Sequence, residues 1–132
     1  MFHFDIETHR RICCLDITQF VKSAVRDSEI DEGVVCVFVP HTTAGVIINE
    51  GADPDVVKDI EKKLASLIPE RENYAHSEGN SDAHIKAVLT GNSLSIPFAD
   101  NSLSLRTWQK IFFCEFDGPR KRSFYVGITA SK

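Results

Sequence analysis

The strongest structural signal in the sequence is a pair of short apolar runs, at residues 34–39 and 45–49. Both are rich in β-branched residues and both are short, which is typical of strands buried on both faces. The polar segment Pro40-His41-Thr42-Thr43 directly follows the first run. We therefore expect His41 to emerge at a strand end, on the border between core and solvent.

Helix signals separate these runs from their neighbours. A helix is expected from Asp16 or Thr18 to about Ser28, because its apolar residues fall on one face. Asp53-Pro54 combines a capping acid with a proline in the first turn, and the apolar stripe that follows ends before Pro69. A shorter helix is expected over residues 82–89, capped by Asn80 or Ser81.

The remaining segments read as strands, at residues 2–8, 11–15, 93–97, 108–116 and 124–129. The turn-rich stretch at 117–120 predicts a hairpin between the last two. Together these patterns predict an α+β fold, a single compact domain over residues 1–132. We expect a mixed or mainly antiparallel β-sheet sandwich with two to three helices.

Length and charge narrow the class of protein. A chain of 132 residues fits one domain, and its net charge of −4 argues against a dedicated nucleic-acid binder. No apolar run approaches the ~20 residues that span a bilayer, and no signal peptide is visible in residues 1–11. The four cysteines form no Cys-x-x-Cys pair, so we expect reduced, buried thiols and a cytoplasmic location. From the charge and the short apolar runs we expect that the protein binds neither nucleic acid nor membrane.

Three histidines are candidates for a metal or catalytic site: His41 at a strand end, His76 in a polar loop and His84 at a helix start. Such a set could form an open tripod with room for water or substrate. The eight-residue spacing between His76 and His84 is not a standard zinc motif, and exposed histidines near a capped helix start are an alternative. Glu50, Glu78 and Asp82 could orient the imidazoles, or could be surface and capping acids.

A second candidate region is the basic run Arg120-Lys121-Arg122 in an acidic protein. Arginine makes bidentate contacts to phosphate, so this run could bind a phosphorylated molecule, or it could be the solvated tip of a hairpin. Trp108 could stack on a heteroaromatic ring, although a single tryptophan opening a strand is more often part of the core.

Several of these motifs, in this order, resemble the YjbQ family, also called secondary thiamine-phosphate synthases. The resemblance covers residues 8–130 and rests on Pro40-His41-Thr42-Thr43-Ala44, Asn49-Glu50-Gly51, Asp53-Pro54, the stretch from His76 to His84 with Asn80, Thr107-Trp108-Gln109 and Glu115-Phe116-Asp117-Gly118-Pro119-Arg120. One departure is Arg106, where the family usually has a small residue.

The resemblance implies a YjbQ-like homotrimer with sites near the subunit contacts and a weak thiamine-phosphate synthase activity, a transferase that joins a thiazole phosphate to a pyrimidine diphosphate. It implies His41, His76 and His84 as metal ligands, with zinc the leading metal and magnesium an alternative for the diphosphate substrate. We expect catalytic roles for Glu50, Asn80 and Arg120, and substrate contacts from Thr42, Asn49, Trp108, Gln109, Arg120 and Arg122. The alternatives are a metal-dependent hydrolase of a phosphorylated or ester substrate, with Glu50 as general base, and a non-catalytic trimeric protein that binds a small ligand.

Overall fold

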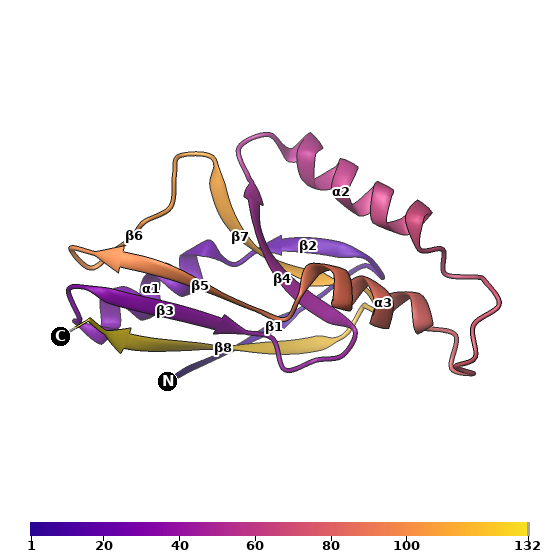
Figure 1. Ribbon diagram of the computed structural model, residues 1–132, viewed down its shortest axis with the longest axis horizontal. Helices are drawn as coiled ribbons and strands as arrows, with labels where there is room; N and C mark the ends of the chain where they lie inside the picture. Colours follow the sequence, from indigo (N-terminus) through magenta and orange to yellow (C-terminus); the bar gives the residue numbers. More distant parts are fainter. Residues whose placement is uncertain (132) are drawn as a thin grey trace.

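Within residues 1–131, which the computed structural model describes, the chain forms eight strands and three helices arranged around two sheets (Figure 1). The strands are β1 (Phe2–Glu7), β2 (Cys13–Asp16), β3 (Gly33–Phe38), β4 (Ala44–Glu50), β5 (Ser93–Ala99), β6 (Ser102–Leu103), β7 (Gln109–Glu115) and β8 (Lys121–Ala130). The helices are α1 (Thr18–Ser28), α2 (Pro54–Leu67) and α3 (Ser81–Thr90). The larger sheet has the order β1-β8-β3-β5-β6 and the smaller β2-β7-β4, and all of these pairs are antiparallel. The predicted single compact α+β domain is confirmed.

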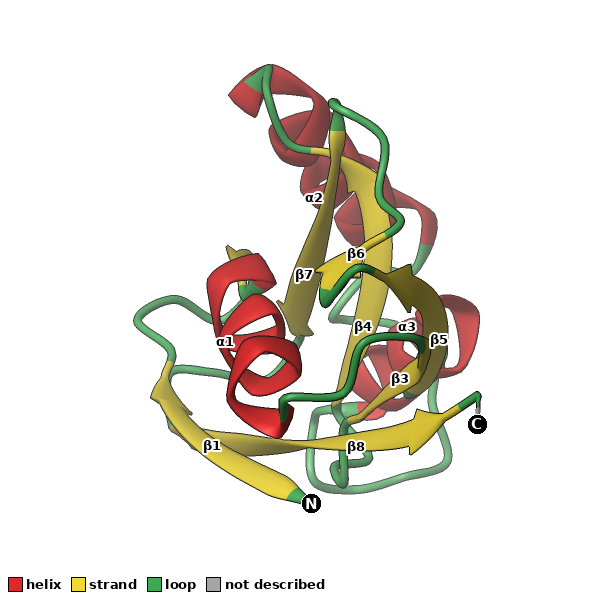
Figure 2. Cartoon of the chain, turned by 90° about the vertical axis from the view of Figure 1, so that its left-hand side faces the viewer, coloured by secondary structure: helices red, strands yellow, loops and turns green. Residues whose placement is uncertain are grey.

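The main core lies between the two sheets and under α1. The larger sheet contributes Val35, Val37 and Phe124, and the smaller sheet contributes Ile111 and Phe113. Helix α1 closes one side of this core, where Figure 2 shows it beside β1 and β7, with its buried residues Val21, Ala24 and Val25. The predicted amphipathic helix therefore buries its apolar face. Burial of apolar surface is the dominant favourable contribution to folding.

A second, smaller apolar cluster covers the other face of the β2-β7-β4 sheet. Phe112, Cys114 and Phe116 pack there against Ala83 of α3, and Val57 and Leu64 of α2 pack against its margin. Helix α2 begins as predicted, because Asp53 Oδ1 accepts a hydrogen bond from the Asp55 N–H at 2.9 Å. No residue of α2 is fully buried, however, so its predicted apolar stripe is only partly covered.

Helix α3 is fixed by a buried ion pair and by a close backbone contact. The Asp82 carboxylate is fully buried and accepts hydrogen bonds from Arg11 at 2.9 and 3.0 Å and from Lys86, whose side chain is also buried. Burial alone would raise the pKa of Asp82, but the hydrogen bonds from Arg11 and Lys86 lower it below its ordinary value. At the far end of the helix, a Cβ atom on Gly45 would lie 2.5 Å from the Gly91 carbonyl oxygen, so only glycine allows this approach of α3 to β4.

Two predictions about strands were wrong, and one strand was missed. The segments 108–116 and 124–129 do not form a hairpin, because β7 belongs to the smaller sheet and β8 pairs with β1 and β3. The run 34–39 is not buried on both faces: burial alternates along β3, because one face of the larger sheet is open to solvent, and Cys36 is therefore exposed. The short strand β6 was not predicted.

Residues 1–131 include no helix long and apolar enough to cross a membrane.

Candidate functional site

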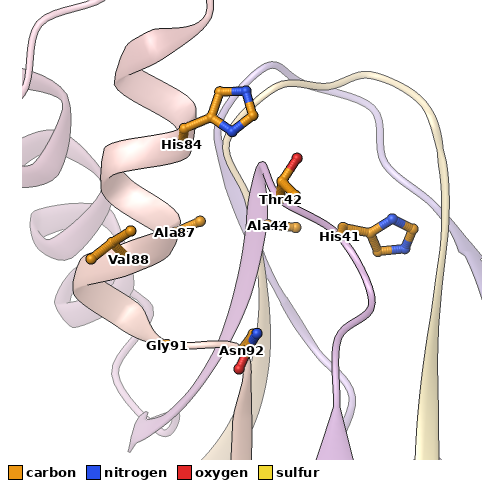
Figure 3. A pocket seen from close by; sticks show the side chains of 8 residues that line it. All are labelled: His41, Thr42, Ala44, His84, Ala87, Val88, Gly91 and Asn92. Atoms are coloured by element: carbon orange, nitrogen blue, oxygen red, sulfur yellow. The ribbon is translucent and has the colours of Figure 1, made fainter.

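A polar pocket of about 450 Å³ lies where the β3–β4 loop, the start of α3 and the β7–β8 connection meet. Its lining includes His41, Thr42, Asn80, His84, Arg120 and Arg122, all predicted from sequence, together with Glu78 and Asp117. An adjoining pocket of about 410 Å³ shares His41, Thr42 and His84, which come from the two sides of the start of β4 (Figure 3). The fold thus brings together polar side chains from three separate segments.

His41 is held by the backbone of β8. Its Nε2 atom lies 3.0 Å from both the N–H and the carbonyl oxygen of Ser123. Burial and the nearby Arg122 guanidinium lower the pKa of His41 below its ordinary value, so the imidazole is neutral at pH 7. In the tautomer whose Nε2–H donates to the Ser123 carbonyl, Nδ1 is the ring nitrogen that remains to accept a proton or a hydrogen bond from a ligand.

His76 and His84 lie side by side near the start of α3. Their ring centroids are 5.5 Å apart and their planes are nearly perpendicular, at 89°. Glu78 Oε2 lies 3.6 Å from His76 Nε2, as expected of an acid that orients this imidazole. The predicted partner Asp82 instead binds Arg11 and Lys86.

The three histidines do not form the predicted zinc tripod. His84 lies close to His76 and shares the pocket with His41, but residues 1–131 contain no group of three His, Cys, Asp or Glu side chains arranged to hold a metal ion. The expectation of zinc is corrected on this ground, because four-coordinate zinc in a catalytic site takes three protein ligands. Magnesium bound together with a diphosphate ligand stays a prediction.

Asn80, Asp117 and Arg120 form a chain of hydrogen bonds along the pocket wall. Asn80 Nδ2 donates to Asp117 Oδ2 at 2.9 Å, and the same oxygen accepts from Arg120 at 3.0 Å. Asn80 occupies the position before α3 but does not cap it with its side chain. Its Oδ1 atom is buried and finds no hydrogen-bond donor among the described residues, which makes it available to a donor group on a ligand.

Arg122 is committed to a buried ion pair rather than exposed to the pocket. Its side chain is 4% exposed and donates to both carboxylate oxygens of Glu115 and to Thr43 Oγ1 at 2.8 Å. Thr8 Oγ1 donates to the same carboxylate at 2.7 Å. This network ties β7, β8 and the β3–β4 loop together next to Ser123, which holds His41, so Arg122 fixes the pocket wall.

The other predicted site residues lie at the opposite end of β4. Asn49 and Glu50 end this strand, and Glu50 lies six residues beyond Ala44, which corresponds to about 20 Å of strand. There Glu50 of β4 is paired with Gln109 of β7. Trp108, which precedes Gln109, is 60% exposed. Glu50 Oε2 accepts hydrogen bonds from the Ala52 and Asp53 N–H groups at 2.8 Å.

Within one chain these residues and the histidine pocket are therefore two separate places. The hydrolase alternative relied on Glu50 as the base, and this placement gives it no support. Arg106 lies at the same distant end, where it is exposed and its backbone N–H donates to Gln109 Oε1 at 2.9 Å.

Sequence reasoning missed two residues that support the pocket, Thr8 and Lys86. Lys86 follows Asp82 by four residues, a spacing that places both on one helix face and could have suggested the pair. Thr8 meets Glu115 across 107 residues, and no local pattern signals such a contact.

Comparison with known proteins gives full-length matches. A family model described as "UPF0047 protein YjbQ-like" matches residues 2–131. The UPF0047 protein MJ1081 of Methanocaldococcus jannaschii is 50% identical over 132 residues, covering 100% of this chain and 96% of that protein. YugU of Bacillus subtilis, also a UPF0047 protein, is 43% identical over 92% of each chain.

Solved structures agree with this result. A YjbQ/UPF0047 family protein of Clostridium acetobutylicum has a TM-score of 0.96 at 47% identity, over 98% of this chain and 100% of that one. A protein of Sulfolobus solfataricus, described as YbjQ-like and of unknown function, has a TM-score of 0.94 at 31% identity, over 98% and 96% of the chains.

These findings correct the expected activity. The relatives carry only the UPF0047 designation, and the Sulfolobus solfataricus structure is described as that of a protein of unknown function. Their names mention neither thiamine phosphate nor a transferase reaction. The predicted thiamine-phosphate synthase activity therefore finds no support among them.

Proposed function

The chain belongs to the YjbQ-like UPF0047 family, and we propose that it binds a small phosphorylated molecule in the pocket between His41 and His84. The observation that carries this proposal is the convergence of Thr42, His84 and Arg120 on one polar hollow at the start of α3. A helix start presents free N–H groups and positive potential, which favour an anion.

Most of the charges around the pocket are offset within the protein; the remaining acid of the lining, Glu78, is 73% exposed and lies beside His76. The charge of Asp117 is offset by its ion pair with Arg120, and that of Glu115 by its ion pair with Arg122. Arg120, whose side chain is 49% exposed, keeps donors that can reach a phosphate oxygen. His84, in the first turns of α3, adds a ring nitrogen on the same side.

The ligand should also carry a hydrogen-bond donor. The buried Asn80 Oδ1 has no partner in the described chain, and leaving such an atom unpaired costs about 1–3 kcal/mol. A hydroxyl or amino group placed beside the phosphate would satisfy it. The neutral His41 ring can accept a proton from the same ligand, so enzymatic turnover stays a prediction for this pocket.

Ligand-induced stabilisation tests the proposal. The Tm of the purified protein should rise with ribose 5-phosphate, which offers both a phosphate and hydroxyl donors, and less with inorganic phosphate. Arg120→Gln should remove most of this rise, whereas Lys121→Gln, an exposed neighbour outside the pocket lining, should leave it unchanged.

Nuclear magnetic resonance locates the binding. The imidazole signals of His41 and His84 should shift on titration with the same ligand, while those of the exposed His3 should not. Absence of any Tm rise at millimolar ligand, or shifts confined to residues outside the pocket, would contradict the proposal.

The cytoplasmic location expected from the cysteines and the homotrimer expected from the resemblance are proposals too. The four free cysteines are compatible with the first, and the partly covered α2 is compatible with the second.

A further inference from the structure

Two free cysteines face each other across the smaller sheet, and neither of them lines the histidine pocket. Cys14 of the edge strand β2 is directly opposite Cys114 of the middle strand β7, and their Sγ atoms are 3.5 Å apart. The other two cysteines differ: Cys13 faces Glu115 in the register, and Cys36 is exposed on the larger sheet.

The backbone around this pair has the geometry that a cross-strand disulfide needs. The Cys14 N–H donates to Glu61 Oε2 at 2.7 Å, so it points away from β7 and the two residues form a non-hydrogen-bonded pair. Such pairs have Cα atoms about 4.5 Å apart, within the range of about 4.4–6.8 Å found for disulfides.

The two thiols differ in access. Cys14 is partly exposed, whereas Cys114 is fully buried among Ala83, Phe112 and Phe116. The contact with Cys14 and burial both raise the pKa of Cys114 well above its ordinary value. An oxidant from solvent therefore reaches Cys14 first and finds Cys114 behind it.

We propose that Cys14 and Cys114 form a reversible disulfide when the protein meets a peroxide. The Cys14 sulfur attacks one oxygen of hydrogen peroxide and the O–O bond breaks. The attacked oxygen stays on Cys14 as a sulfenic acid, and the other leaves as water with the thiol proton. The Cys114 sulfur then attacks the Cys14 sulfur and displaces the hydroxyl group, which leaves as a second water with the Cys114 proton. Two thiols are oxidised and one hydrogen peroxide is reduced to two waters.

The structure permits the movement that the bond requires. The Sγ atoms must approach from 3.5 Å to about 2.05 Å, and β2, with a sheet neighbour on one side only, can shift toward β7. The bond would link residues 100 positions apart, and a cross-link that closes so long a loop restricts the unfolded chain strongly. The oxidised protein should therefore have a higher Tm, and dithiothreitol should reverse the change.

Peptide mapping of the unaltered protein tests the proposal. After treatment with hydrogen peroxide, the intact chain should have lost two hydrogen atoms, and alkylation in denaturant should then label two of its four cysteines. Digestion without reductant should then yield one linked species that joins the peptides containing Cys14 and Cys114.

Variants separate this pair from the other cysteines. Cys36→Ser and Cys13→Ser should still form the link, and Cys14→Ser should not. Sulfinic acid on Cys14 with a free Cys114, or links through Cys36 alone, would overturn the proposal. Because the mapping uses the unaltered chain, its result stands whether or not a Cys114→Ser variant folds.

Discussion

At the residue scale, the contact with most influence on the pocket is the buried ion pair between Glu115 and Arg122. Both side chains are almost completely removed from solvent, and they join β7 to β8 at the point where the chain passes between sheets. If one partner is lost, the charge of the other stays buried, where water cannot solvate it. Removing one member should therefore cost much more than the pair itself contributes.

We expect Glu115→Gln to lower the free energy of unfolding by about 3–5 kcal/mol, because Arg122 would keep a buried charge without a counter-charge. Urea unfolding measures the change. Glu7→Gln, which alters an exposed acid on β1, should change stability by less than about 0.5 kcal/mol. A loss in Glu115→Gln no larger than in this control would show that the pair does not hold the two sheets together.

The same pair predicts a pH dependence. Burial alone would raise the pKa of Glu115, but hydrogen bonds from Arg122 and Thr8 lower it below its ordinary value. The folded state therefore binds this proton less readily than the unfolded state. Its stabilisation is complete above pH ~4.5 and is lost as the pH falls through the folded pKa. In urea unfolding at successive pH values, Glu115→Gln should lack this part of the acid destabilisation.

A second prediction at this scale concerns His41. Its lowered pKa means that the imidazole should become protonated only below the ordinary midpoint of about 6.5. Nuclear magnetic resonance titration of the ring signals gives the midpoint directly, and His41→Gln identifies the signal. A midpoint at or above 6.5 would contradict the neutral ring on which proton acceptance depends.

At the element scale, the position of α3 decides the shape of the pocket. Its first turns carry His84, and its end approaches β4 so closely that Gly45 cannot carry a side chain. Moving this helix would displace one wall of the pocket while leaving the main core intact.

Gly45→Ala tests this dependence. The new Cβ would lie 2.2 Å from Thr90 Oγ1 and 2.5 Å from the Gly91 carbonyl, so we expect a loss of about 1–3 kcal/mol and weaker ligand binding. Gly127→Ala is the matched control, because its Cβ would meet nothing nearer than 3.9 Å. Equal stability of the two variants would show that α3 can move away without cost.

The elements predictable from sequence are those fixed by local chemistry. Helix α2 begins at Asp53-Pro54 because a capping carboxylate and a proline act within one turn, and both are visible in the sequence. The segments of β3 and β4 were identified for a similar reason, from short runs of β-branched residues. The pocket residues, among them His41 and Arg120, were identified from sequence motifs. The motifs did not predict how far apart these residues lie in the fold.

The sheet to which each strand belongs could not be predicted in this way. The connection 117–120 looks like a hairpin turn, yet β8 pairs with β1, more than a hundred residues away. The same limit applies to Glu50 and Trp108, whose motifs suggest one site with His41, although they lie at the end of β4 and just before β7, far from that histidine. Contacts between distant segments decide both cases.

At the scale of the whole molecule, apolar side chains remain uncovered on the α2 and α3 side. Val88 is 80% exposed, Leu67 61% and Leu89 56%. Exposed apolar patches of this kind often mark association surfaces.

We expect the chain to sediment as a trimer, and Val88→Ser combined with Leu89→Ser to shift it toward the monomer, because the substitutions remove apolar area that association would bury. Sedimentation velocity measures both. Val34→Ser, on the exposed face of β3 and 43% exposed before substitution, should leave the mass unchanged. A monomer at micromolar concentration would contradict the trimer.

The strand order β1-β8-β3 has a consequence for synthesis on the ribosome. Strand β8 separates β1 from β3, although it is translated long after both. Until residues 121–130 emerge, β1 has no neighbour to pair with and one edge of β3 stays open. The nascent chain must therefore hold two incomplete strands through most of its translation, a period in which unpaired edges are open to aggregation and to chaperone binding.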